Sequence, residues 1–572
     1  MTAILDLHPH YYYTAAIPIS NLSQYGDTLW FSCDFTYPIP FPVLNVRTQC
    51  LNISVPLDWN NSTTSETISI FVRRIYADQP NKPNTKQLWQ LGGGAAVPGS
   101  VLESTAVQII QSIAQIFPQG SIDIYLYDKR GTGKSSWLDC TLEDFLYNFA
   151  GCITVALKHH NRIKHNTYTN TAKDLKYLID LSAANNEVYV MGMSNGAYLA
   201  QRYLTIAPFQ SNGIILDSFP PPDRTQILLQ NINIDFTGLD IMVKCSQDNF
   251  CSQMFYDNNP IRALYELKMK MMHNGSICGQ ILNINYRDLS EKMSFCLLGG
   301  SFELIPAIIF RTIRCSPQDQ LVLKNFLIAS QPATDGTQEG ISLLFEWNHN
   351  WSELWSSIYV PQLSCDTINE IDNTLLFTQK ILQTFCQNKV QGDQAKAIGY
   401  PQDEYYGKYS NSTIPVIALH GELDQAIPSW MAYHAADQYS KLNPNFRLIK
   451  FPYTGHVPTG YSPEIGQGSA TTNNCAYKVI VSFILNGGQS IDDTCTKFIV
   501  PFDFIGQTDQ IKNTAMQFFN TTDLWGKPFT EPISSTTATA VSPTVESSIV
   551  GTIIFSITIG GYSNFFFLYY LW

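Results

Sequence analysis

Short apolar runs rich in β-branched residues alternate along the chain with longer segments of helical periodicity. The runs predict strands over residues 66–76, 87–91, 122–127, 187–191, 213–216, 414–419 and 446–451. The periodic segments predict helices over residues 102–117, 171–183, 196–206, 430–439 and 475–485. Because a strand–helix–strand connection joins parallel neighbours, this alternation predicts an α/β fold with a mostly parallel sheet and helices on both faces.

Residues 220–409 interrupt the alternation between two predicted strands. They are richer in helix formers and carry seven of the cysteines, which predicts a largely helical cap domain inserted over an edge of the sheet. We therefore expect the two halves of the core over residues 66–219 and 410–500. An N-terminal extension over residues 1–65 and a C-terminal extension over residues 501–530 flank them.

The composition is that of a globular protein without an affinity for nucleic acid. Of the 572 residues, 45% are hydrophobic and 14% are charged. The net charge is −12, and no block of Lys and Arg provides an electrostatic match to a phosphate backbone. We expect no nucleic-acid partner, and the sequence leaves the oligomeric state open.

Cysteines and sequons indicate an oxidising compartment. Thirteen cysteines would be many for a cytosolic enzyme, and none forms CxxC or stands with His at zinc-finger spacing, so we expect disulfides and no metal site. Asn-x-Ser/Thr sequons agree with secretion. The candidate glycosylation sites are Asn52, Asn61, Asn274, Asn350, Asn411 and Asn520.

The two ends of the chain bear on its location. Residues 1–13 show no basic stretch and no apolar run of the length of a secretion signal. Residues 531–548 form a Ser/Thr-rich spacer, and the uncharged residues 549–572 that follow could cross a bilayer core of about 30 Å. This tail fits either a transmembrane helix or a lipid-anchor signal. We expect a protein of the secretory pathway held on the extracellular face of a membrane.

Gly192-Met-Ser194-Asn195-Gly196 has the pattern G-x-S-x-G at the point where a β-branched strand passes into a helix. The two glycines permit a turn so sharp that it points the serine hydroxyl outward at the top of the sheet. The context therefore predicts that Ser194 is a nucleophile, rather than a serine that caps the helix. The backbone N–H of Asn195 at the helix N-terminus would face a developing oxyanion.

A serine nucleophile needs a histidine base and a carboxylate that orients the histidine. In a fold of this kind the chain order is Ser, then Asp or Glu, then His. Asp424 follows the predicted strand over residues 414–419, and His456 follows the strand over residues 446–451. Glu422 is the rival carboxylate, but it lies closer to the end of its strand, so we favour Asp424.

Gly92, Gly93 and Gly94 form a glycine-rich loop after an early strand, where α/β hydrolases place a second oxyanion donor. We expect this donor to be Gly93 or Gly94. Neither this run nor residues 131–135 complete a nucleotide-binding fingerprint, so no cofactor is expected.

These blocks together resemble the prolyl and tripeptidyl aminopeptidases, which are serine peptidases of the α/β-hydrolase fold. The matching blocks are residues 50–58, the glycine loop, the Asp-x-Arg-Gly-x-Gly-x-Ser pattern of residues 128–135, the serine turn, the Asp424/His456 pair and residues 475–488. The glycine loop departs from the family's usual Gly-Gly-Pro-Gly. The resemblance implies a peptide substrate, cleavage near its N-terminus and a substrate amine bound by acidic groups of the cap.

Cysteines flank several of these blocks. We predict the disulfides Cys33–Cys50, Cys140–Cys152 and Cys475–Cys495, and a further one, Cys245–Cys251, within the cap. The leading functional hypothesis is a serine exopeptidase that acts through an acyl-enzyme. The alternatives are a serine esterase or lipase of the same fold, and a catalytically inactive protein that binds partners at the cell surface.

Overall fold

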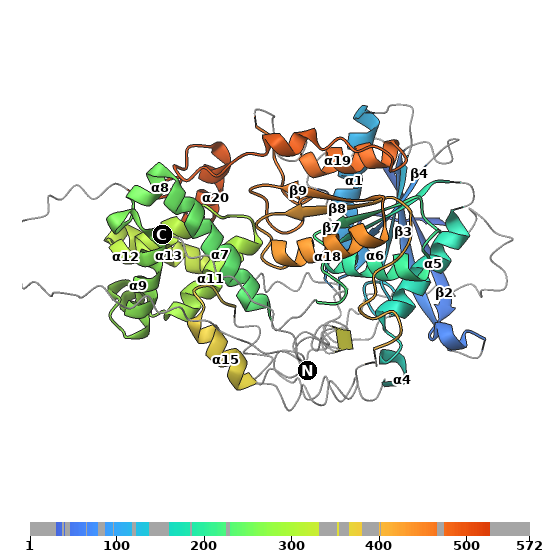
Figure 1. Cartoon of the computed structure of the whole chain (residues 1–572), viewed down its shortest axis with the longest axis horizontal. Coiled ribbons are helices and arrows are strands. Elements are labelled where there is room, and N and C mark those ends of the chain that lie inside the picture. Colours follow the sequence, from blue (N-terminus) through green and yellow to red (C-terminus); the bar gives the residue numbers. More distant parts are fainter. Residues whose placement is uncertain are drawn as a thin grey trace, which may run out of the picture.

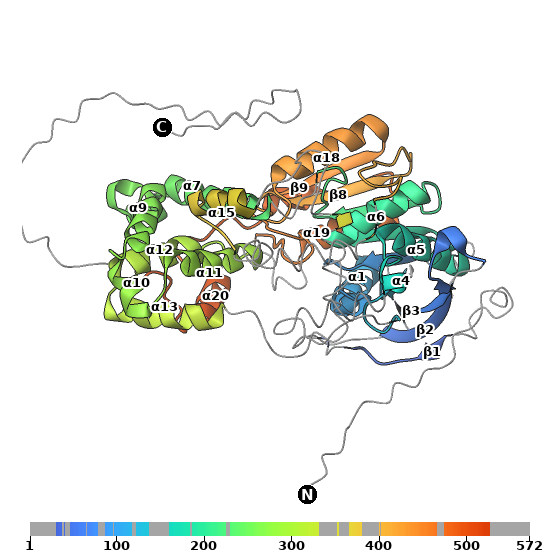
Figure 2. The same ribbon diagram turned by 90° about the horizontal axis from the view of Figure 1, so that it is seen from below.

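The computed structural model consists of a sheet flanked by helices and a helical lobe beside it (Figures 1 and 2). It describes residues 30–36, 39, 46–63, 66–77, 86–94, 97–116, 122–136, 160–183, 186–224, 229–330, 352–353, 365–379, 400, 402–465 and 474–526.

The strands of the described residues form one sheet in the order β1-β2-β3-β5-β4-β6-β7-β8-β9. Their bounds are β1 Phe31–Ser32, β2 Val46–Pro56, β3 Thr67–Ala77, β4 Lys86–Leu91, β5 Ile122–Tyr127, β6 Val188–Met193, β7 Gly213–Asp217, β8 Val416–Gly421 and β9 Phe446–Phe451. All neighbours from β5 to β9 in this order are parallel, whereas β1, β2, β3 and β5 pair antiparallel. This is the mostly parallel α/β sheet that the sequence predicts.

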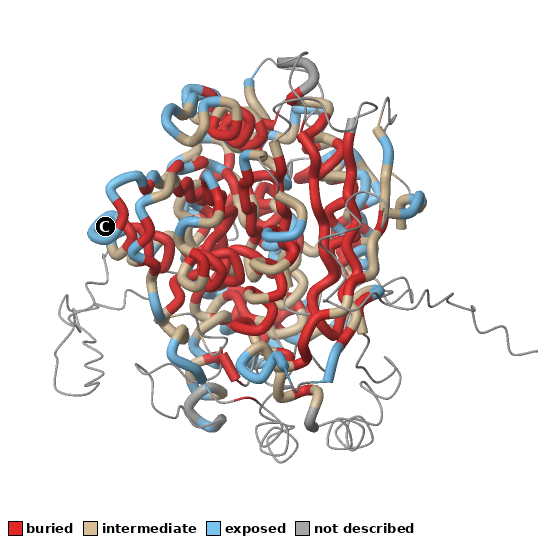
Figure 3. Tube along the Cα trace, turned by 90° about the vertical axis from the view of Figure 1, so that its right-hand side faces the viewer, coloured by how far each residue is buried: buried red, intermediate tan, exposed pale blue. Residues whose placement is uncertain are grey.

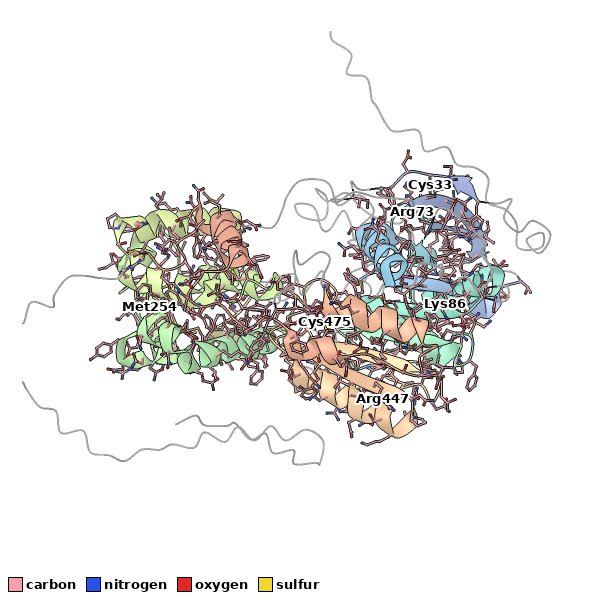
Figure 4. The ribbon with its side chains drawn as sticks, turned by 90° about the horizontal axis from the view of Figure 1, so that it is seen from above. Cys33, Arg73, Lys86, Met254, Arg447 and Cys475 are labelled. Carbon is pink, nitrogen blue, oxygen red and sulfur yellow. A yellow bond between two sulfur atoms is a disulfide. The ribbon has the colours of Figure 1, made fainter. Side chains whose placement is uncertain are left out.

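The antiparallel edge was not predicted from the sequence. Strand β2 pairs along its whole length with β3, although it lies within the predicted N-terminal extension over residues 1–65. Only four of its eleven residues are buried, and they form neither a continuous apolar run nor a regular alternation. Arg73 of β3 ties this edge together, because its guanidinium donates to the Asp34 carbonyl at 3.0 Å and to Thr36 Oγ1 at 2.8 Å, close to Cys33 (Figure 4).

Helices cover both faces of the sheet. Helices α1 (Glu103–Ile116) and α19 (Cys475–Leu485) pack on one face, and α5 (Tyr168–Ser182), α6 (Asn195–Ile206) and α18 (Ser429–Leu442) pack on the other (Figure 1). The central strands β5, β6, β7 and β8 are buried at every position. Buried segments run through the middle of the molecule (Figure 3). The mostly apolar sequences of these strands explain why they are predicted to within two residues at either end.

The chain between β7 and β8 forms most of the helical lobe. Among the residues that the structure describes, its helices are α7 (Gln230–Gln247), α8 (Asn249–Gln253), α9 (Pro260–Met272), α10 (Ile277–Leu282), α11 (Tyr286–Leu298), α12 (Leu304–Arg314), α13 (Pro317–Ala329) and α15 (Cys365–Thr374). Helices α7 to α13 share one hydrophobic core that is separate from the two cores on the faces of the sheet. This lobe is the largely helical insertion that the sequence predicts.

The C-terminal extension predicted over residues 501–530 packs into the same lobe. Helix α20 (Asp509–Phe519) lies against α13, and Trp525 is buried against Phe255 and Phe310. The buried Arg311 of α12 donates to the carbonyls of Asp523 at 2.8 Å and Leu524 at 3.0 Å. The lobe is therefore completed by chain that follows the last strand, and the insertion alone does not account for its core.

Four disulfides join described residues. Three of them, Cys33–Cys50, Cys245–Cys251 and Cys475–Cys495, were predicted, with Cα atoms 5.9, 5.2 and 5.6 Å apart. The fourth, Cys278–Cys315, links α10 to the end of α12 and was not predicted. Cys140 and Cys152 lie outside the described residues, and among the described cysteines Cys296 is free and buried. These bridges are compatible with an extracellular or secretory location.

Most of the predicted attachment sites can be placed. Asn61, Asn274, Asn411 and Asn520 are exposed and Asn52 is half-buried, whereas Asn350 lies outside the described residues. No helix in the part of the chain that the structure describes is long and apolar enough to span a bilayer. The predicted spacer over residues 531–548 and the tail over residues 549–572 lie outside that part.

Candidate active site

Ser194 occupies a strained turn between β6 and α6. Its backbone angles are φ 53° and ψ −118°, a conformation that non-glycine residues rarely adopt. Both neighbouring glycines are required by close approach, because a Cβ on Gly192 would lie 2.2 Å from the Gly196 carbonyl oxygen. A Cβ on Gly196 would lie 2.1 Å from the Leu91 carbonyl oxygen. Strain held in this way by surrounding structure is typical of a nucleophile turn.

The hydroxyl of Ser194 does not cap the helix that it precedes. Its Oγ lies 2.8 Å from Nε2 of His456, which is in the loop after β9. The backbone N–H of Ser194 donates to the Asp217 carbonyl at the end of β7 at 2.7 Å. Of the two readings that the sequence offers for this serine, the geometry favours the nucleophile over the cap.

Asp424 meets the opposite side of the same imidazole. Both carboxylate oxygens lie 2.9 Å from Nδ1 of His456, and Oδ1 also accepts the backbone N–H groups of Ala426 and Ile427 at 2.9 and 2.8 Å. The rival Glu422 is exposed and accepts the hydroxyl of Tyr433 at 3.4 Å instead. The structure thus brings Ser194, His456 and Asp424 together and leaves Glu422 outside.

The electrostatics of this pair suit a histidine that accepts a proton. Burial alone would raise the pKa of Asp424, but the adjoining imidazole and the hydrogen bonds hold that pKa below its ordinary value. Burial alone would lower the pKa of His456, but the charge of Asp424 and its hydrogen bond outweigh it and raise that pKa. An ionised Asp424 therefore stabilises the imidazolium that would form when Ser194 loses its proton.

His420, the other histidine at the end of a strand, has no such partner. It is fully buried, and its Nε2 lies 3.0 Å from the Ser429 hydroxyl. Burial lowers the pKa of His420 to about 4, so it is neutral at physiological pH. Its contact with Ser429 at the start of α18 indicates a structural role.

Asp217 and Ser218 hold the histidine loop, and sequence reasoning missed both. The Ser218 hydroxyl accepts the N–H of Val457 at 2.8 Å, and the Asp217 carboxylate accepts both the N–H and the hydroxyl of Thr459. Val457 is β-branched at φ 60°, a strained backbone that these contacts hold in place. Their signal in the sequence is a polar pair directly after a wholly apolar strand, the position from which side chains reach the carboxyl edge of the sheet.

The candidate oxyanion residues lie on two sides of Ser194. Asn195 begins α6, and its side-chain oxygen accepts the hydroxyl of Tyr168. Gly93 approaches Ser194 so closely that a Cβ on it would lie 3.3 Å from Ser194 Cβ, whereas Gly94 has φ +74° and lies next to Val97. A glycine loop and a helix N-terminus therefore both lie beside Ser194, where their N–H groups could serve as oxyanion donors.

The helical lobe reaches the loops that carry the two partners of Ser194. A Cβ on Gly455, next to His456, would lie 2.8 Å from the Phe302 ring before α12. Leu423, next to Asp424, belongs to the hydrophobic core of the lobe. The lobe therefore contacts the acid and histidine loops directly. Among the described residues, no group of three His, Cys, Asp or Glu side chains could hold a metal ion.

The strand order and the serine turn define an α/β-hydrolase fold. No protein-family model matches the chain, and a search of curated proteins found no match. Among solved structures, a peroxisomal α/β-hydrolase from Saccharomyces cerevisiae is 10% identical with a TM-score of 0.34, covering 82% of this chain and 95% of its own.

A probable hydrolytic enzyme from Pseudomonas aeruginosa is 13% identical with a TM-score of 0.31, covering 80% of this chain and 96% of its own. A proline iminopeptidase from Mycobacterium smegmatis is 13% identical with a TM-score of 0.26, covering 71% and 91%. At these values the fold assignment rests on the strand order and the serine turn of this chain.

Proposed function

We propose that this protein is a serine hydrolase in which Ser194, His456 and Asp424 form the catalytic triad. The observation that carries the proposal is the continuous hydrogen-bonded chain from Ser194 Oγ through both nitrogens of His456 to Asp424. The three residues come from loops at the same edge of the sheet, after β6, β8 and β9. The strained backbone of Ser194 supports the same role, because its hydroxyl makes no capping hydrogen bond to the helix that follows.

In the proposed reaction, His456 Nε2 takes the proton of Ser194 while Oγ attacks the carbonyl carbon of the substrate. The carbonyl π electrons move to its oxygen, and N–H groups of Asn195 and of the glycine loop stabilise that oxyanion. When the tetrahedral intermediate collapses, the imidazolium gives its proton to the leaving amine and an acyl-enzyme forms. A water molecule, deprotonated by His456, then releases the acid and restores Ser194.

We propose peptides, cleaved near their N-terminus, as the substrate class. The resemblance of the sequence blocks to prolyl and tripeptidyl aminopeptidases supports this choice. The position of the helical lobe supports it as well, since Phe302 contacts the histidine loop and Leu423 anchors the acid loop to the lobe. A lobe in contact with the loops beside Ser194 would limit access to short or terminal segments of a chain.

The deciding experiment compares leaving groups and chain lengths on purified protein. Aminoacyl, dipeptidyl and tripeptidyl amides with a free N-terminus are assayed beside N-acetylated versions and short-chain esters, with Ser194→Ala as the background control. We expect the free-amine peptidyl amides to have the highest kcat/KM, and acetylation to reduce it. A preference for esters over all amides would make the protein an esterase or lipase.

We propose an extracellular site of action on a membrane surface. The disulfides of the described residues support an oxidising environment, and the exposed sequons at Asn61, Asn274, Asn411 and Asn520 are accessible for glycosylation. Residues 549–572 would provide the attachment, either as a transmembrane helix or as a lipid-anchor signal. Enzymatic deglycosylation and detergent partitioning of the full chain test the two parts of this proposal separately.

A further inference from the structure

Lys129 lies in the turn after β5 with its side chain buried beneath the glycine loop. Its ammonium donates to the Gly94 carbonyl at 2.6 Å and approaches the Gly92 carbonyl at 3.5 Å. A buried ammonium is costly unless it is hydrogen-bonded, so its place beneath a loop of glycines needs an explanation. Lys129 belongs to the Asp-x-Arg-Gly-x-Gly-x-Ser block, to which the proposed reaction assigns no role.

The turn that carries Lys129 is braced from several sides. The hydroxyl and the N–H of Thr132 donate to the Lys129 carbonyl at 2.8 and 2.9 Å. The buried Asp128 accepts the N–H of Gly99, beyond the glycine loop, at 2.8 Å, and the N–H of Lys134 at 2.8 Å. The same turn thus holds the glycine loop at both ends, through Asp128 at its exit and through Lys129 at its start.

Because the peptide bond is planar, a hydrogen bond that fixes a carbonyl also fixes the direction of the N–H in the same peptide. In a trans peptide the carbonyl of one residue and the N–H of the next point in opposite directions. When the Gly92 carbonyl faces Lys129, the N–H of Gly93 therefore points away from Lys129. Gly93 is also the glycine that packs against Ser194, and the Gly94 carbonyl, one residue further along the loop, is held by the same ammonium.

We propose that Lys129 is a positioning residue that orients the Gly93 N–H as the second oxyanion donor, beside Asn195. The inference rests on the proposed serine hydrolase and refines it, because the sequence leaves Gly93 and Gly94 as equal candidates. It also addresses the departure of this loop from Gly-Gly-Pro-Gly. Where the family's loop contains a proline that limits backbone freedom, this loop takes its restraint from a buried ammonium.

The test replaces Lys129 by Met, which removes the donor, by Gln, which keeps a neutral donor, and by Arg, which keeps donor and charge. Lys134→Met is the matched control, because Lys134 lies in the same turn but is exposed, with its ammonium over the Phe71 ring at 5.2 Å. For each variant, kcat and KM on the best peptidyl amide, the thermal midpoint, and the inhibition constant of a tripeptide aldehyde are measured. The aldehyde forms a hemiacetal with Ser194 Oγ, whose oxygen occupies the oxyanion position.

We expect Lys129→Met to lower kcat about 10²-fold, the loss associated with one oxyanion donor, with KM changed less than about threefold. The aldehyde should bind more weakly by a similar factor, while binding of a substrate-like amide inhibitor is unchanged. Lys129→Arg should recover most of the loss and Lys129→Gln part of it, and Lys134→Met should match the wild type.

A folded Lys129→Met protein with wild-type kcat and aldehyde affinity would overturn the inference and leave the triad untouched. If Lys129→Met does not fold, the aldehyde affinities of Lys129→Gln and Lys129→Arg test the inference instead. Affinities of both variants equal to that of the wild type would overturn it. A wild-type protein that hydrolyses none of the substrates and is not modified at Ser194 would instead contradict the proposed function itself.

Discussion

Asp217 connects to Ser194 through its main chain, since its carbonyl accepts the Ser194 N–H at 2.7 Å. The side chain of the same residue accepts two hydrogen bonds from Thr459 in the histidine loop. One residue at the end of β7 therefore joins the serine turn to the loop that carries His456. The relative position of the serine and the histidine therefore depends on β7, one of the two strands that lie between β6 and β9 in the sheet.

The first prediction concerns the protonation of Asp217. Burial raises its pKa from 3.8 to about 7, although the bonds from Thr459 and the charge of His456 oppose the rise and Asp424 adds to it. A carboxyl with a raised pKa in the folded state stabilises the protein fully below its unfolded pKa, and that contribution is lost as pH rises through about 7. Asp217→Asn should thus become more stable relative to the wild type between pH 5 and pH 8, by about 2–4 kcal/mol.

Urea denaturation of both proteins at the two pH values measures this difference. His456, Asp424 and Tyr477 are the titratable groups coupled to Asp217, so the comparison is repeated in a His456→Gln background. A stability difference between Asp217→Asn and the wild type that does not change with pH would show that Asp217 is ionised throughout.

The second prediction separates the two carboxylates of the loop after β8. Asp424→Asn should lower kcat about 10⁴-fold, because the amide holds His456 in the wrong tautomer. Glu422→Gln should lower it less than about threefold, because Glu422 is exposed and its carboxylate accepts a hydrogen bond from Tyr433 instead of His456. Steady-state kinetics on both variants decide the assignment, and it is wrong if Glu422→Gln proves the more damaging change.

The third prediction is the acid limb of the activity profile. His456 must be neutral to accept the Ser194 proton, so activity falls as pH drops through its pKa. Asp424 raises that pKa above the ordinary 6.5 against the opposing effect of burial. The limb in kcat/KM should therefore have its midpoint above 6.5, and a rate that is constant from pH 5 to pH 8 would contradict a histidine base.

The fourth prediction tests whether the segment after the last strand belongs to the helical lobe. Trp525 is buried, and its indole N–H donates to the Phe504 carbonyl at 2.6 Å. Trp525→Ala should cost about 3–5 kcal/mol of unfolding free energy. Phe498→Ala, a matched change at an exposed aromatic residue, should cost less than about 0.5 kcal/mol. Equal costs in chemical denaturation would mean that the segment is not part of the folded core.

The parts of the fold that follow from the sequence are those whose local pattern and tertiary role agree. Strands β5 and β9 and helix α19 have their predicted bounds, since each combines a distinct apolar pattern with clear turn residues at its ends. The sequence does not predict strand β2 or helix α20. Strand β2 is only half-buried, and helix α20 is apolar on a single face that meets a distant part of the chain.

The residues of the candidate site likewise fall into those that the sequence predicts and those that it does not. Ser194, Asp424 and His456 follow from the sequence because each lies after a predictable strand, and loops after parallel strands meet at one edge. Asp217, Ser218 and Lys129 do not follow, because their roles depend on hydrogen bonds to backbone groups of other loops. The spacing of residues along the chain does not show which backbone groups of a folded loop still need a hydrogen-bond partner.

Covalent labelling decides whether Ser194 is an activated nucleophile. Purified full chain is incubated with a fluorophosphonate, and intact mass and peptide mapping locate the adduct, with Ser194→Ala as the control. We expect one adduct, on Ser194, that is abolished in Ser194→Ala and slowed at least about 10³-fold in Asp424→Asn. An unmodified Ser194 in folded protein, or labelling that persists in Ser194→Ala at the same rate, would contradict it.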